Sequence, residues 1–220
     1  MVLKLISKLL MTKQLQFDEG KIDVKGMKMN LLPSNSTSAF MKYFLETKEL
    51  EKLYMLSWFW GHTVVYNISK KFGLEKPEEI YSMGMNFGEA MGFGLYCTHD
   101  YHPGEYTHFE IENNPFLESI DSEREEPIDY VISGIMGGGG CMVHEEVCQN
   151  VEIKCMNAGD ELCEFLTGTK KELKSRGLWS IAKERYNLEK FLPVQKKIYD
   201  QYDGTNDSDL LDDLVTHLTD

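Results

Sequence analysis

Two thiols and a carboxylate lie close together in one short stretch of the chain. Glu152 and Cys155 are three residues apart, and Cys163 follows the pair Gly159-Asp160. A Gly-Asp pair is typical of a tight turn between antiparallel strands. Because paired strands lie about 4.8 Å apart, such a turn would bring Cys163 beside Cys155. Zn²⁺ binds thiolates and carboxylates at about 2.0–2.3 Å, so the segment predicts a hairpin that clamps a metal ion.

Two other interpretations of these thiols remain open. Cysteine is often buried simply as a small apolar residue, and Cys155 and Cys163 are also placed to form a cross-strand disulfide. The chain has five cysteines in 220 residues, and its first residues do not read as a secretion signal. We therefore expect a cytoplasmic protein in a reducing compartment, where disulfides are uncommon.

The residues around the hairpin resemble the 4-vinyl-reductase domain family. Members carry a glycine-rich helix, then a strand with Glu-x-x-Cys, then the ending Gly-Asp-x-x-Cys-x-Phe. In this chain the glycine-rich part begins at Gly134, the strand motif runs from Glu152 to Cys155, and the ending runs from Gly159 to Phe165. The motif covers about a sixth of the chain, and a looser likeness reaches from the N-terminal strands to about Gly168.

This resemblance implies a fold and a set of metal ligands. The fold would be α+β, with helices packed on a mainly antiparallel sheet, as in the small subunits of the TRAPP tethering complex. The family includes aromatic-sensing domains of transcription activators, whose zinc is held by a Cys before the glycine helix, a Glu and two later Cys. Carried over, the ligands are Asp129, Glu152, Cys155 and Cys163. Asp129 stands where the sensors have Cys, and aspartate also binds zinc.

Charge and hydropathy exclude several classes of protein. Acidic residues outnumber basic ones by 36 to 23, for a net charge of −13. Nucleic-acid binding depends on a concentrated basic surface, so we expect no nucleic-acid partner. No apolar run approaches the ~20 residues of a membrane span. We also find no helix-turn-helix or ATPase segment, so a sensor of this kind would signal through another protein.

The chain divides at the end of the family likeness. We expect a ligand-binding domain over residues 1–168 and a helical extension over residues 169–220. Alternation predicts two short strands within Gln14–Leu32 and another over Glu105–Glu112, while Leu50–Phe72 is typical of a long apolar helix. Two helices are expected between residues 170 and 202. The acidic stretch after them is either a docking helix or a frayed tail.

Glycines recur every fourth residue in a predicted helix that begins near Lys76. Gly84, Gly88 and Gly92 would share one face. Glycine costs about 1 kcal/mol relative to alanine inside a helix, so a full stripe indicates close approach by another group. A neighbouring helix, including one across a homodimer axis, is one interpretation, and a flat ligand lying against the backbone is the other.

The leading hypothesis is a sensor-type module that binds a small apolar or aromatic compound without transforming it. The resemblance implies a cavity between the helices and the sheet, and we expect an apolar one of about 300 Å³ or more. Aromatic and imidazole groups are the candidate lining, although large aromatics usually just pack in the core. These candidates are Trp58, Trp60, His62, Tyr106, His108 and Phe109.

Two alternative functions follow from the same resemblance. One is a vinyl-reductase enzyme acting on a tetrapyrrole or a related conjugated molecule; it would need an external electron donor, since no nicotinamide or flavin fingerprint is evident. The other is a dimeric TRAPP-like scaffold. The enzyme hypothesis predicts a reactive polar group in the cavity, and the sensor hypothesis predicts an apolar cavity. The scaffold hypothesis predicts a filled interior and a large apolar patch on the surface.

Overall fold

The computed structural model describes residues 9, 11, 12, 14–18, 21–29, 34–117, 120 and 126–219. Its strands are β1 (Leu15–Asp18), β2 (Lys21–Val24), β3 (Met27–Met29), β4 (Leu95–His102), β5 (Tyr106–Glu112), β6 (Cys148–Lys154) and β7 (Cys163–Thr169). Its helices are α2 (Ser34–Thr47), α3 (Leu50–Phe72), α4 (Pro77–Ala90), α5 (Tyr130–His144), α6 (Lys170–Ser175), α7 (Trp179–Arg185), α8 (Leu188–Gln201) and α9 (Asp207–Thr219), with a 3-10 turn η1 (Met156–Ala158).

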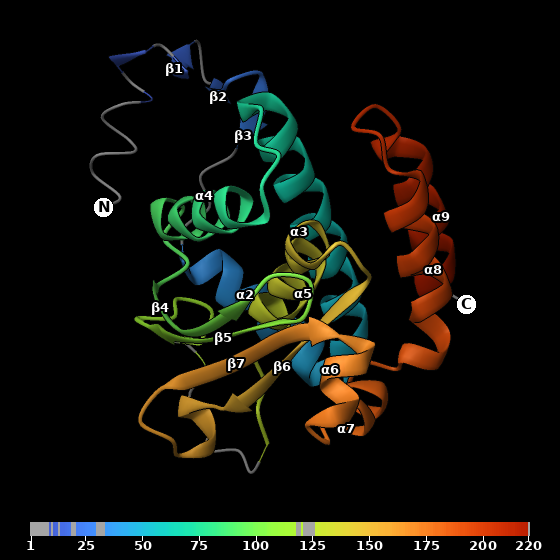
Figure 1. The fold of residues 1–220 in the computed structure, drawn as a ribbon. Helices are drawn as coiled ribbons and strands as arrows, with labels where there is room; N and C mark the ends of the chain where they lie inside the picture. Colours follow the sequence, from blue (N-terminus) through green and yellow to red (C-terminus); the bar gives the residue numbers. More distant parts are fainter. Residues whose placement is uncertain are drawn as a thin grey trace.

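The larger sheet has the order β4-β5-β7-β6, and every neighbouring pair is antiparallel. Along β5 the side chains alternate, so that Thr107, Phe109 and Ile111 are buried and the residues between them are partly exposed. Helices α3 and α5 lie over the buried face, and α6 and α7 lie near the ends of β6 and β7 (Figure 1). The predicted α+β class, with helices on an antiparallel sheet, is confirmed.

Helix α5 runs between α3 and the sheet, and glycine makes this layer thin enough to fit. A Cβ on Gly138 would overlap the backbone carbonyl of Trp58, and one on Gly61 would overlap that of Ile135. On the opposite side, a Cβ on Gly140 would lie 2.5 Å from a methyl carbon of Thr167 in the sheet. The run of glycines therefore brings two backbones into direct contact, which larger residues would prevent.

The helical extension shares one hydrophobic core with the rest of the molecule. Tyr54 of α3 stacks on Tyr186, with ring centroids 3.7 Å apart, and Gln149 of β6 donates a hydrogen bond to Gln195 of α8 at 2.8 Å. The apolar side of α9 is buried in the same cluster. The predicted division at residue 168 thus runs through a common core, and α8 and α9 lie along one side of the molecule (Figure 1).

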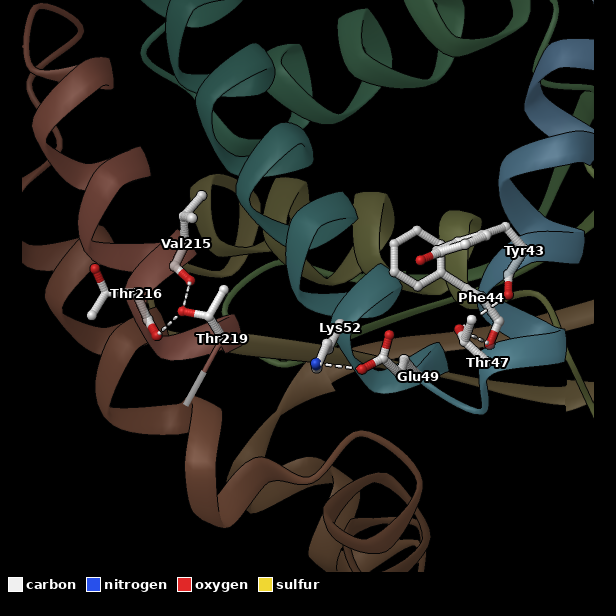
Figure 2. Close-up of polar contacts among 8 residues, drawn as sticks. All are labelled: Tyr43, Phe44, Thr47, Glu49, Lys52, Val215, Thr216 and Thr219. Carbon is white, nitrogen blue, oxygen red and sulfur yellow. Dashed lines mark hydrogen bonds and ion pairs between the residues drawn. The ribbon is translucent and has the colours of Figure 1, made fainter.

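Local side-chain contacts fix several helix ends (Figure 2). At the end of α2, the Thr47 hydroxyl donates to the backbone carbonyls of Tyr43 and Phe44. At the end of α9, Thr219 donates in the same way to Val215 and Thr216. In both helices the threonine hydroxyl bonds back to carbonyls three and four residues earlier in the last turn. The acidic C-terminal stretch is therefore an ordered helix up to Thr219 rather than a frayed tail.

Three details differ from the sequence-based expectations. The segment around Gln14–Leu32 contains three strands instead of two, because the chain turns again at Lys25 and Gly26, both with positive φ. Strand β4, which we did not predict, has an irregular, mostly exposed pattern. Three helices rather than two lie between residues 170 and 202. No helix in the described part of the chain is long and apolar enough to cross a bilayer.

Candidate metal centre and ligand cavity

The predicted thiol hairpin is present at the junction of β6 and β7. Cys155 follows directly after β6, and Cys163 is the first residue of β7. Between them η1 and Gly159, with a φ of +96°, reverse the chain, a conformation that favours glycine. The Asp160 carboxylate accepts a hydrogen bond from the Cys155 backbone N–H at 2.8 Å. The turn thus holds the two cysteines on adjacent antiparallel strands.

Three potential ligands converge at this hairpin. One donor atom from each of Glu152, Cys155 and Cys163 lies within 4.8 Å of the others, and all three residues are buried. Glu152 Oε2 accepts a hydrogen bond from the backbone N–H of Asp129 at 2.8 Å, whereas Oε1 has no hydrogen-bond partner. Both cysteines are free thiols. Two soft sulfurs and an unpartnered carboxylate oxygen at this spacing fit a tetrahedral Zn²⁺.

Burial and mutual repulsion govern the acidity of this cluster. Burial raises the pKa of Glu152, and the charges of Asp129 and Cys155 raise it further. A hydrogen bond from the Cys163 thiol lowers the pKa of Cys155 to about 6, and the same bond raises the pKa of Cys163 well above its usual value. A bound divalent cation would offset the negative charge that burial disfavours here.

Asp129 lies beside the three ligands but is already engaged. It caps the N-terminus of α5, where its Oδ1 accepts a hydrogen bond from the backbone N–H of Ile132 at 2.8 Å, and its Oδ2 accepts one from Asn114. Burial raises its pKa to about 7. A bond from Asp129 to a metal ion would replace one of these hydrogen bonds, so its role as the fourth ligand stays a prediction.

A cavity of about 90 Å³ lies between α3, α4, α5 and the inner face of the sheet. Its walls are mainly apolar and include Ile68, Phe109, Met85, Met91 and Met136. The volume is smaller than the 300 Å³ we expected, and smaller than the about 150 Å³ of an apolar cavity that admits benzene. The three methionines are flexible, and their rotation would enlarge the space for a ring-sized ligand.

Two of the three glycines in the predicted stripe line this cavity. Gly84 and Gly88 both line the cavity, and a Cβ on Gly84 would meet nothing within 4 Å. A Cβ on Gly88 would lie 3.1 Å from the ring of Tyr96. Gly92 lies beyond the end of α4, with a φ of +81°. The stripe therefore leaves room in a cavity wall, in keeping with the interpretation of a ligand near the backbone.

One end of the cavity is polar. Thr107 of β5, His144 at the end of α5 and Thr167 of β7 all line it, and each is 3% exposed. The Thr107 hydroxyl and His144 Nε2 are hydrogen-bonded at 3.1 Å. Thr167 Oγ1 accepts a hydrogen bond from Asn150 at 2.8 Å. Sequence reasoning missed this group, because its members are far apart in the chain and only the packing of α5 on the sheet unites them.

The structure separates the six residues predicted to bind the ligand. Trp60 and Phe109 line the cavity, and the other four do not. Trp58 is fully buried in the core, where its Nε1 donates to the carbonyl of Cys148, and His62 stacks on it. Two of the six lie on the other face of the sheet: Tyr106 beneath the Arg176 guanidinium, and His108 hydrogen-bonded to Glu164.

A second pair of thiols lies in the core, to which the sequence analysis gave no role. The backbone N–H of Cys148 donates to Cys141 Sγ at 3.2 Å. Burial tends to raise the pKa of Cys141, but the Cys148 thiol and the nearby His62 imidazole outweigh it and lower the pKa to about 6. Both ring nitrogens of His62 are buried without a hydrogen-bond partner. This pair connects α5 to β6, at a distance from the hairpin cluster.

Comparison with known proteins finds no sequence match but identifies solved structures with a similar fold. No family model and no curated protein matches the sequence. Among solved structures, the phenol-responsive sensory domain of the transcription activator PoxR, solved with phenol, superposes with a TM-score of 0.62 at 17% identity. The match covers 79% of this chain and 94% of that domain. At such low identity the similarity shows a shared fold.

Two further structures are more weakly similar. A trafficking protein particle complex subunit 3 from Naegleria fowleri, covalently bound to palmitic acid, matches with a TM-score of 0.48 at 16% identity, over 61% of this chain and 91% of that one. A vinyl-4-reductase family protein from Methanocaldococcus jannaschii matches with a TM-score of 0.43 at 17% identity, over 63% and 82%. Both scores are too low to support an argument about this chain.

Proposed function

We propose that this protein is a ligand-binding module of the sensor type, which holds a small apolar or aromatic compound in the cavity beneath α4. The observation that carries the proposal is the cavity itself, an apolar space bordered by three helices and the sheet in a fold shared with a phenol-responsive sensory domain. Ligand cavities are typically apolar with a few converging polar groups, and this cavity has both features.

We also propose that the chain belongs to the 4-vinyl-reductase domain family and carries its zinc hairpin. Support comes from the sequence motif and from the convergence of Glu152, Cys155 and Cys163. When bound, zinc would supply a cross-link between β6 and β7. Glu152 would extend this link to α5, because its other oxygen accepts a hydrogen bond from the backbone of Asp129. The ion would thereby stiffen the sheet edge that supports α5.

Helix α4 is the element best placed to report occupancy. It forms a wall of the cavity through Ile80, Gly84 and Gly88 and ends near Met91. A ligand that displaces the methionine side chains would change how α4 packs on α3 and α5. The altered surface would then be recognised by another protein. The predicted homodimer, with a contact through a glycine stripe, stays a prediction.

A direct binding experiment tests the sensor proposal. Trp60 lines the cavity and is 38% exposed, so a ligand should quench its fluorescence. Binding should also raise the melting temperature by mass action. We expect both effects with small aromatic compounds and their loss in the variant Gly84→Leu, which would fill the cavity. A lack of any shift across aromatic and tetrapyrrole panels would refute the proposal, and turnover of a vinyl tetrapyrrole with an added electron donor would favour the enzyme.

A further inference from the structure

Two imidazoles lie next to each other on the outer face of the larger sheet, the face turned away from α3 and α5. His99 belongs to β4 and His108 to the neighbouring strand β5, and their ring centroids are 5.0 Å apart. The two side chains are 40% and 24% exposed, so solutes reach both rings. An ion can therefore approach the pair without displacing any residue of the core.

Each ring is held by a carboxylate of the next strand. His99 Nε2 lies 2.9 Å from Glu110 Oε2, and His108 Nε2 lies 2.6 Å from Glu164 Oε1. An ionised carboxylate only accepts hydrogen bonds, so each neutral ring carries its proton on Nε2 and its lone pair on Nδ1. Neither Nδ1 is hydrogen-bonded to a described residue. Histidines that bind metal ions typically have such a carboxylate, which fixes the tautomer and makes the other nitrogen more basic.

The separation of the two rings fits one shared ion. A Zn²⁺–N bond is about 2.0–2.1 Å long and an imidazole nitrogen lies about 1.2 Å from its ring centroid, so each centroid would lie about 3.2 Å from the ion. At a tetrahedral angle the two centroids would then be about 5 Å apart. This is the separation that His99 and His108 already have.

The charges around the rings favour a cation. Glu110 and Glu164 are directly opposite each other where β5 pairs with β7, and like charges in this position are destabilising. Lys154 forms an ion pair with Glu164, but Glu110 has no such contact with a Lys or Arg among the described residues. A divalent cation bound to the two imidazoles would offset the negative charge that remains.

We propose that His99 and His108 form a second metal site, which binds a divalent transition-metal ion such as Zn²⁺ and in which Glu110 and Glu164 orient the two rings. The described residues contain a single group of three donor atoms within 4.8 Å, at the hairpin, so this site has two protein ligands and its other positions are open to water. Imidazole binds Zn²⁺, Cu²⁺ and Ni²⁺ well, whereas Mg²⁺ and Ca²⁺ prefer oxygen. The site is independent of the proposed function, because its residues belong neither to the cavity nor to the hairpin.

Calorimetric titration of the full chain with Zn²⁺, after a first equivalent has been added for the hairpin, tests the proposal. We expect one further equivalent to bind more weakly than the first, and Mg²⁺ to bind at neither place. His99→Gln and His108→Gln should each reduce the affinity for the further equivalent more than about tenfold and leave the first unchanged. His102→Gln is the matched control, since His102 is also exposed on β4 but lies outside the pair.

The variant Glu110→Gln tests the orienting role of the carboxylates. Loss of such a partner typically weakens metal binding about 10–100-fold, so the further equivalent should bind at least tenfold more weakly. The melting temperature without metal shows whether the fold is intact. Unchanged affinity in this variant would overturn the role of Glu110.

The site itself is overturned if no further equivalent binds, or if both histidine variants retain it. Binding that both histidine variants lose and His102→Gln keeps supports the site, whether or not the hairpin binds zinc. Failure of this inference therefore leaves the hairpin and the cavity untouched, and failure of either of those leaves this site standing.

Discussion

Two helices of this protein carry glycines at four-residue spacing, and they use them in opposite ways. In α5, Gly134 and Gly138 lie against the backbone of α3, with no room for a Cβ. In α4, a Cβ on Gly84 would enter open space at the cavity wall. The α5 region, with the thiol hairpin beside it, is closed and tightly packed. The α4 region encloses a cavity lined by flexible methionines.

This contrast shows that glycine spacing reports a shared helix face but not what covers that face. In the closed region, a missing side chain lets two backbones approach, and stability is the result. In the region of the cavity, a missing side chain leaves space for a ligand at the expense of about 1 kcal/mol of helix stability per glycine. Substitutions should therefore have large effects in the first region and small ones in the second.

The largest effect should come from the hairpin cluster of the closed region. Cys163→Ser removes one proposed zinc ligand, and we expect loss of one equivalent of zinc with a fall of about 5 kcal/mol in the free energy of unfolding, roughly 10–20 °C in melting temperature. Elemental analysis and calorimetry of protein purified without chelator measure both. Cys97→Ser is the matched control, since Cys97 is exposed and far from the motif.

The zinc proposal would be contradicted if wild-type protein purified without chelator contained no zinc, or if removal of zinc left its melting temperature unchanged.

The variant Asp129→Asn tests whether Asp129 is the fourth ligand. The amide still accepts the hydrogen bond from the Ile132 backbone, so the helix cap should survive. Weaker zinc affinity with the cap intact would support Asp129 as a ligand, and unchanged affinity would exclude it.

Gly138→Ala should be the next most damaging change. The added methyl group would overlap the carbonyl of Trp58, so α3 and α5 must separate along their contact. We expect a loss of about 4 kcal/mol in the free energy of unfolding, measured by urea titration. Little change would mean that α5 can shift away from α3 without disturbing the core.

A pH effect should arise at the polar end of the cavity. Burial lowers the pKa of His144 from 6.5 to about 4, so between these values the unfolded chain takes up a proton that the folded chain does not. The stability linked to this histidine is full above about pH 6.5 and is lost as the pH falls to 4, by about 3 kcal/mol. Urea unfolding of the wild type and of His144→Gln across this pH range measures the free energy of unfolding at each pH. This free energy should depend more steeply on pH in the wild type. His102→Gln, at an exposed position, should keep the wild-type slope.

Gly84→Ala should have the smallest effect on stability, and the opposite sign. The methyl group meets no atom within 4 Å, and alanine favours a helix interior, so we expect a gain of up to about 1 kcal/mol. Because Gly84 lines the cavity, the same change should weaken binding of small aromatic compounds. A clear destabilisation would show that the space beside Gly84 is filled in solution.

Patterns among neighbouring residues were enough to predict the hairpin, strand β5 and the three candidate metal ligands. The Gly-Asp turn and the period-two pattern of β5 depend on neighbouring residues alone, and both are present. The hairpin ligands were found because Glu152, Cys155 and Cys163 lie within twelve residues of one another. Phe40 and Tyr43 of α2 show the limit, because both rings are exposed and residue type alone does not tell which side of a helix faces the core.

By itself the sequence predicted the α+β class through its resemblance to a known family. It predicted the antiparallel hairpin and its three candidate ligands through turn chemistry and spacing, which act over a few residues. The tertiary structure decided which aromatic residues line the cavity, where its polar end lies and what each glycine stripe contacts. Trp58 and Trp60 are two residues apart, yet one is core and the other cavity wall. Thr107, His144 and Thr167 meet because α5 packs across the sheet, a contact between distant segments that no local pattern encodes.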